Sequence, residues 1–166
     1  MQFNSYNSII LGAILTFFFP ALVMAKGLVY PDPSILPSEV VSIQLNGLKN
    51  NDINKKDFGI QQAWAFAHPR NRAFTGPLRR FSMMLKSPPY DTLLNHKSHS
   101  IKNLTSPEKG QDEDGADWQK FDVLMERPNG RILYFSWVVQ KVTQGNFKDC
   151  WMTISVSAPL AAGQSG

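Results

Sequence analysis

Three histidines and one aspartate are the side chains of this sequence best suited to move protons. An imidazole changes charge near neutral pH, and a carboxylate can act as a base when a pocket shields it from water. His96, His99 and Asp91 are the candidates for a general base, although Asp91 also suits a cap or turn. His68 directly precedes Pro69 at the expected end of a helix, where we predict a structural role with exposed carbonyl groups.

The metal-binding residue types are too poorly spaced to predict a metal site. His96 and His99 are three residues apart, and on a strand this spacing points two side chains to opposite faces of the sheet. Cys150 is the only cysteine, so no internal disulfide can form, and we interpret it as a small buried hydrophobe. We therefore predict no metal ion and no cofactor.

A run of basic residues lies in the middle of the chain. Between Phe58 and Tyr90 there are five lysine or arginine residues and no carboxylate, whereas acidic residues crowd between Glu108 and Asp117. Arginine binds phosphate and carboxylate groups in a bidentate manner, so the run predicts an anion site; solvated surface is the alternative. The absence of a groove-reading motif argues against nucleic acid as a partner. The candidate anion-binding residues are Arg70, Arg72, Arg79 and Arg80.

Large apolar side chains recur in every segment that has a regular pattern. Core packing is the default explanation, because the chain needs such residues to fold. A curved sheet too wide to be filled by its own side chains would leave a pocket lined by some of the same residues. The candidate ligand-binding walls are Trp64, Phe81, Met84, Phe121, Tyr134, Trp137 and Trp151.

Three helices are expected to position these side chains. The segment 38–49 opens with a serine suited to capping and repeats valine and leucine at three- and four-residue intervals. The segment 58–68 repeats apolar residues at the same intervals, with Asp57 as the predicted cap and a proline at its end. The segment 77–87 begins with a proline in its first turn and stops at a double proline. An irregular linker is expected between the second and third helices.

The second half of the chain reads as strands. Apolar and polar residues alternate in 118–126, and Asn129-Gly130 marks a hairpin turn before the long segment 132–142. That segment is apolar on both faces, which is typical of a central strand or of one that lines a cavity. Residues 150–156 alternate again, segments within 90–104 are weaker strand candidates, and 106–117 is a predicted loop.

Helices followed by a run of strands predict the α+β class. The arrangement that buries both sets of apolar faces is a curved antiparallel sheet of four to five strands, with three N-terminal helices packed on one side. Such a sheet would be cone-like, with a cavity between the two layers.

Four segments carry a resemblance to a known family: 37–52, 59–81, 93–96 and 149–156. They resemble a family of exported bacterial and plastid-type proteins of unknown function. That family is similar to the nuclear transport factor two-like superfamily, whose fold is a cone of curved sheet wrapped by helices. The resemblance covers most of residues 37–157 and implies an apolar, open-ended cavity, but it carries over no catalytic residues.

The resemblance leaves two functional hypotheses, because the superfamily includes both enzymes and non-catalytic modules. The first is an exported non-catalytic binding module that holds a small apolar or anionic ligand, or a protein partner, in or around a cone-shaped cavity. The second is a cofactor-free lyase or isomerase with a histidine or aspartate base in the cavity. The apolar segment 132–139 contains no carboxylate, which favours the binding module.

The first 25 residues carry no charged side chain. They contain an apolar run and end in Val23-Met24-Ala25, so we predict a signal peptide over 1–25 and an exported, periplasmic or secreted protein. A retained membrane anchor is the alternative, because Lys26 follows the run. We further expect a leader at 26–36, one domain at 37–157, a disordered tail at 158–166 and a homodimer through the open face of the sheet.

Overall fold

The computed structural model describes residues 27–53 and 55–161. The predicted signal peptide and the last five residues of the predicted tail lie outside these ranges. Within the ranges, none of the helices combines the length and the apolar sequence that a membrane crossing requires.

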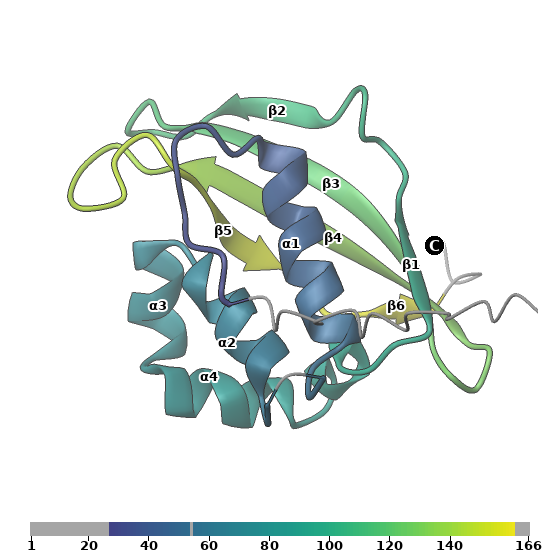
Figure 1. Ribbon diagram of the computed structural model, residues 1–166. Coiled ribbons are helices and arrows are strands. Elements are labelled where there is room, and N and C mark those ends of the chain that lie inside the picture. The colour runs from purple at the N-terminus through teal and green to yellow at the C-terminus, as the bar shows by residue number, and fades with distance from the viewer. Residues whose placement is uncertain (1–26, 54, 162–166) are drawn as a thin grey trace, which may run out of the picture.

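The predicted α+β class is confirmed. The helices gather on one side of an antiparallel sheet, and α1 lies across that sheet (Figure 1). The described residues form four α-helices, where three were predicted, and one 3₁₀ helix. These elements are α1 (Pro37–Lys49), α2 (Phe58–Ala65), α3 (Pro69–Thr75), α4 (Leu78–Leu85) and η1 (Tyr90–Leu93).

The additional helix is α3, in the segment expected to be an irregular linker. Pro69 does not end α2, which stops at Ala65, earlier than predicted. Pro69 instead occupies the first turn of the next helix, where its missing amide hydrogen costs nothing. The His68 Nδ1 atom accepts a hydrogen bond from the Arg70 amide at 3.1 Å and so caps the start of α3. Asp57, the predicted cap of α2, instead has a left-handed backbone, and its carboxylate accepts a hydrogen bond from the Lys86 ammonium group.

The sheet has six strands where four to five were predicted, and it is not closed. β1, β3, β4 and β5 are neighbours in that order, while β2 pairs with β3 and β6 pairs with β4. β2 and β6 fall in the predicted loop and the predicted tail. β2 pairs with the first residues of β3, and β6 pairs with Leu133 and Tyr134 of β4. The strands are β1 (Ser98–Ile101), β2 (Glu108–Gln111), β3 (Asp117–Glu126), β4 (Ile132–Lys141), β5 (Trp151–Val156) and β6 (Leu160–Ala161).

The central strand β4 separates a buried face from a half-exposed one. Its core-facing residues are Leu133, Phe135, Trp137 and Val139, all of which are buried. On the opposite face Tyr134 and Val138 are only half-buried and Ile132 is 40% exposed. Of the two alternatives predicted for this strand, the central position is confirmed, and its second apolar face is less covered than the first.

A β-bulge changes the face that β5 presents to the helices. Val138 pairs with Ser155 and Val139 pairs with Thr153, so Ile154 is left without a partner on β4. Such an extra residue bends the strand and re-aims its side chains. As a result Thr153 lies on the same face as Val139 and points towards the helical layer.

The helices α1 and α2 approach each other closely at two glycines. A Cβ atom built on Gly59 would lie 2.0 Å from the Gly47 carbonyl oxygen and 2.9 Å from the Asn51 Cα atom. The Asn51 side chain also accepts a hydrogen bond from the Ile60 amide at 3.0 Å. Only glycine at position 59 allows this approach, which seats α2 against α1.

Candidate functional site

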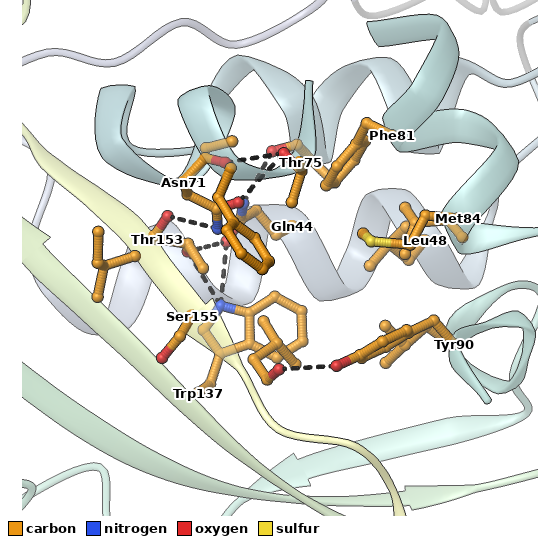
Figure 2. A pocket seen from close by; sticks show the side chains of 17 residues that line it. Gln44, Leu48, Asn71, Thr75, Phe81, Met84, Tyr90, Trp137, Thr153 and Ser155 are labelled. Carbon is orange, nitrogen blue, oxygen red and sulfur yellow. Dashed lines mark hydrogen bonds between the residues drawn. The ribbon is translucent and has the colours of Figure 1, made fainter. Parts of the chain in front are cut away.

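A cavity of about 240 Å³ lies between the helical layer and the sheet. Figure 2 shows its lining, with α3 and α4 on one side, β4 and β5 on the other and Tyr90 of η1 at one end. Most of the lining side chains are apolar, and none is a carboxylate, histidine, lysine or arginine. The apolar lining residues are Leu48, Ala63, Ala67, Phe74, Phe81, Met84, Leu85, Leu93, Trp137, Ile154 and Val156.

A hydrogen-bonded group joins the two layers at the base of this cavity. The Trp137 Nε1 atom donates to Gln44 Oε1 at 3.1 Å and to Thr153 Oγ1 at 3.0 Å, and the Thr153 hydroxyl also donates to Gln44 Oε1. The Gln44 Nε2 atom donates to the Ala63 carbonyl at 2.9 Å. All three side chains are buried, so these bonds hold one indole, one amide and one hydroxyl in fixed orientations. We call Gln44, Trp137 and Thr153 the polar triad.

The position of Thr153 depends on backbone contacts with the segment between α2 and α3. The Thr153 amide donates to the Phe66 carbonyl and the His68 amide donates to the Thr153 carbonyl, both at 2.8 Å. The Asn71 side chain adds a third bond, to the Thr153 carbonyl at 3.2 Å. The Thr75 hydroxyl in turn donates to the Asn71 carbonyl at 2.9 Å (Figure 2). The edge of β5 is therefore tied to the helices that cover the cavity.

The cavity opens to solvent between α3 and the end of β5. Phe74 and Ser155 both line the cavity and both are exposed, so they mark its mouth. Ser155 does so as part of the edge strand, because it pairs with Val138 and its side chain lies on the opposite face of the sheet. Tyr90 lies at the end away from the polar triad, where its hydroxyl donates to the Val156 carbonyl at 3.4 Å. A ligand entering here would meet apolar side chains first and the polar triad at the base.

Three of the seven predicted wall residues line the cavity: Phe81, Met84 and Trp137. The other four lie elsewhere. Trp64 packs beside Phe81 with ring centroids 5.2 Å apart, and Phe121 is a core residue directly across from Trp137. Tyr134 points to the opposite face of the sheet, and the ring of Trp151 lies 5.4 Å from the Lys141 ammonium group.

Sequence reasoning did not single out the polar residues of the cavity. Gln44 had a visible signal, because it lies one turn from Val40 and from Leu48 on the buried face of α1. A polar residue on such a face needs a buried partner. Thr153 had no comparable signal, since only the bulge at Ile154 turns it towards the helices.

None of the candidate bases lines the cavity. Asp91 belongs to η1 and borders a separate surface groove beside Arg127 and Arg131. His96 is buried and His99 is half-buried, near the C-terminal end of α1 where Lys49 lies. The structure therefore does not bring the three candidates together around one reacting position.

The expectation that His96 and His99 point to opposite faces is wrong. His96 precedes β1, and Asn95 before it has a left-handed backbone with φ of 52°, so strand alternation does not apply to this pair. The His96 Nε2 and His99 Nδ1 atoms lie 2.7 Å apart, and His96 Nδ1 lies 2.9 Å from the Leu93 carbonyl oxygen. At 2.7 Å the two nitrogen atoms share a hydrogen bond.

Burial makes these imidazoles poor proton acceptors. Desolvation lowers the pKa of His96 to about 4, against the effect of its bond to the Leu93 carbonyl. Desolvation also lowers the pKa of His99, and the nearby Lys49 charge lowers it further. The pKa of His68 is lowered to about 4, mainly by desolvation and then by the Arg70 charge. All three rings are neutral at pH 7.

The four candidate anion-binding arginines do not converge on one site. Arg70 pairs with Asp112 at 2.9 Å. The Arg72 guanidinium lies between the rings of Trp64 and Phe147, 5.0 and 5.2 Å from their centroids, and donates to the carbonyls of Trp64 and Ala65. Arg79 and Arg80, on the first turn of α4, are exposed.

Cys150 is buried among Val142, Met152 and Phe147, on the far side of the sheet from the cavity. Burial raises the pKa of its thiol, which fits the interpretation of this cysteine as a small hydrophobe. In the part of the chain that the structure describes, no three side chains of histidine, cysteine, aspartate or glutamate are placed to hold a metal ion.

Comparison with known proteins gives one partial similarity. No protein-family model matches the chain, and no solved structure matches it. The chain is similar to the isoleucine–tRNA ligase of Natronomonas pharaonis, with 27% identity over 135 residues. The matched region covers 75% of this chain but only 13% of the ligase, so the chain spans a small part of that relative's length.

Proposed function

We propose that this protein is a non-catalytic module that binds a small, largely apolar and uncharged ligand in the cavity between its helices and its sheet. The observation that carries the proposal is the lining: an apolar wall with a fixed polar triad at its base and no charged side chain. Ligand sites of this kind use a few placed polar groups to orient a mostly apolar molecule. An uncharged ligand is favoured over an anionic one, because an anion here would lose its hydration without gaining a partner of opposite charge.

The size of the cavity limits what it holds. An engineered apolar cavity of about 150 Å³ binds benzene. At about 240 Å³ the present cavity suits a molecule somewhat larger than benzene. At its base Gln44 Oε1 already accepts two hydrogen bonds, whereas Thr153 Oγ1 accepts only the one from Trp137 and can accept another. An alcohol, or an amide with an N–H group, on a short apolar chain supplies the matching donor.

No specific observation favours the lyase or isomerase hypothesis. A general base has to reach a proton of the bound substrate, and His96, His99 and Asp91 all lie off the cavity lining. The similarity to the isoleucine–tRNA ligase covers too little of that enzyme to bring its activity to this chain. We therefore propose binding alone.

The remaining features of the proposed module rest on the sequence. A cone-like curvature of the sheet, export after cleavage of residues 1–25 and a homodimer through the half-exposed face of the sheet are parts of the proposal. Tyr134 and Val138 give that face its apolar character. If the cavity proves inaccessible to small molecules, we propose that the module binds a protein partner instead.

The test is a titration of the domain with hexan-1-ol and with hexanoate, monitored by the NMR signal of the Trp137 indole N–H group. We expect hexan-1-ol to shift that signal, because the indole lies in the cavity wall, and hexanoate to bind more weakly. Ala63→Leu should fill part of the cavity and weaken hexan-1-ol binding at least about tenfold, because Ala63 is buried in the cavity wall. Ala158→Leu places the same side chain on an exposed position and should leave binding unchanged.

Two results would contradict the proposal. The first is a Trp137 signal that stays unchanged up to the solubility limit of hexan-1-ol. The second is equal binding by the Ala63→Leu and Ala158→Leu variants, which would place the alcohol outside this cavity.

A further inference from the structure

We propose that the corner between α3 and α4 docks on an anionic lipid bilayer, with Phe74 inserted among the lipids and Arg79 and Arg80 bound to their headgroups. This docking surface goes beyond the proposed ligand cavity and does not require the cavity to be filled. It comprises residues 74–80, which join the last turn of α3 to the first turn of α4.

The geometry of this corner makes an apolar side chain project. Phe74 is 85% exposed, the highest value among the large exposed hydrophobic residues of the described chain. Gly76 has φ of 81°, a conformation that favours glycine, and Pro77 follows it at the start of α4. The chain therefore turns sharply after α3, and Phe74, on the last turn of that helix, faces solvent instead of packing between helices.

The charge of the corner complements an anionic surface. Arg79 and Arg80 are both exposed, and no carboxylate of residues 27–53 or 55–161 forms an ion pair with either of them. The stem of Arg80 packs against Gly76, since a Cβ atom there would lie 2.7 Å from Arg80 Cδ. The neighbouring basic residues Arg70 and Lys86 are paired with aspartates, so Arg79 and Arg80 are the free charges.

The position of the corner in the fold leaves it accessible. In Figure 1, α3 and α4 lie at the edge of the molecule away from β2 and β3, with their connecting turn on the outside. The sheet therefore does not obstruct an approaching flat surface. Phe74 and Thr75 also line the mouth of the cavity, so a docked bilayer would lie next to that mouth.

A bilayer fits this combination better than an acidic protein does. One projecting phenyl ring beside two unpaired guanidinium groups matches the interface of a membrane, where rings enter the acyl boundary and arginines contact headgroups. An acidic protein partner would need a matching apolar pocket for Phe74, whereas a bilayer takes up a projecting ring without one. With one ring and two charges, the binding should be weak, reversible and sensitive to salt.

The first experiment is co-sedimentation with two kinds of vesicle, phosphatidylcholine alone and phosphatidylcholine mixed about equally with phosphatidylglycerol. We expect binding to the mixed vesicles only, and a decrease on adding salt. The double variant Arg79→Ala/Arg80→Ala should bind about thirty-fold more weakly, as follows from the usual contribution of a basic residue near an anionic surface. Arg127→Ala/Arg131→Ala removes the same charge from the β3–β4 turn and should bind like the unaltered protein.

The second experiment tests insertion of the ring. Phe74→Cys, labelled with an environment-sensitive fluorophore, should shift to shorter wavelength on mixed vesicles, because the label enters an apolar region. Leu160→Cys is the matched control, since Leu160 is 56% exposed and lies on β6 away from the corner. Cys150 is buried, so labelling is directed to the introduced thiol.

The outcomes separate this proposal from the cavity proposal. Ala63→Leu should lose hexan-1-ol binding and keep vesicle binding, because it fills the cavity without altering the corner. Absence of binding to mixed vesicles would overturn the docking proposal. That result is expected if the partner of the corner is an acidic protein. Equal losses of vesicle binding in the two arginine double variants would also overturn it, since the attraction would then come from overall charge. Equal fluorescence shifts at positions 74 and 160 would overturn it as well, since insertion would then not be specific to the corner.

Discussion

Replacing Gln44 with methionine would test whether the polar triad holds the two layers together. Methionine has a similar length and no hydrogen-bonding group, so the substitution removes three bonds with little change in volume. Trp137 keeps Thr153 as its acceptor, but the Thr153 hydroxyl and the Ala63 carbonyl each lose their bond to Gln44. A buried polar group left unpaired costs about 1–3 kcal/mol.

We therefore expect Gln44→Met to lower the free energy of unfolding by about 2–4 kcal/mol, because the added apolar surface offsets part of the loss of two partners. Thr153→Val should cost less, about 1 kcal/mol, since Trp137 and Gln44 still bond to each other without it. This order follows from the position of Gln44, which contacts both other members and the helix α2.

The assay is urea unfolding at pH 7 with linear extrapolation, in which a lower midpoint at an unchanged slope reports a loss of stability. Gln61→Met is the matched control, because Gln61 is half-exposed and its bond to the Lys56 carbonyl is long, at 3.5 Å. It should change stability by less than about 0.5 kcal/mol. A loss below about 1 kcal/mol for Gln44→Met, or an equal loss for Thr153→Val, would refute this account of the triad.

Three further predictions concern other buried contacts. The pKa values of His68 and His96 are lowered from 6.5 to about 4, so between these pH values the unfolded chain binds more protons than the folded protein. The free energy of unfolding, measured in urea, should therefore fall as pH is lowered from 6.5 towards 4. This fall should be less steep in His96→Gln. Gly59→Ala should reduce stability by more than about 2 kcal/mol in the same assay, since its Cβ atom would overlap α1, whereas Gly27→Ala should have no effect. Arg72→Lys should cost about 1–3 kcal/mol, because lysine cannot reproduce the stacked, doubly bonded guanidinium.

Each of these has a result that would contradict it. A stability that is constant between pH 6.5 and 4 would mean that His68 and His96 titrate normally in the folded protein. A Gly59→Ala variant as stable as Gly27→Ala would show that α1 and α2 separate without cost. An Arg72→Lys variant as stable as the unaltered protein would show that only the positive charge at position 72 matters, and not the stacking or the paired hydrogen bonds of the guanidinium.

The sequence alone predicted the elements that depend on neighbouring residues. Apolar periodicity located three of the four helices, and Asn129-Gly130 located the hairpin between β3 and β4. Both signals are local, since they depend on side chains within one or two turns of each other. The α3 helix was missed because Pro69 was interpreted as the end of the preceding helix, whereas α2 ends at Ala65 and Pro69, capped by His68, begins α3.

The candidate site was decided by tertiary structure. Gln44 and Thr153 are 109 residues apart, and they meet because the bulge at Ile154 turns Thr153 towards α1. The contact between His96 and His99 likewise depends on the left-handed backbone of Asn95, which sequence spacing does not show.

Local sterics and periodicity determine which segments are helices and strands, and these can be read from the chain. The partner of a buried polar group depends on strand register and on how the layers are seated. One inserted residue in a strand changes both, so the chemistry of the cavity emerges only in the folded molecule.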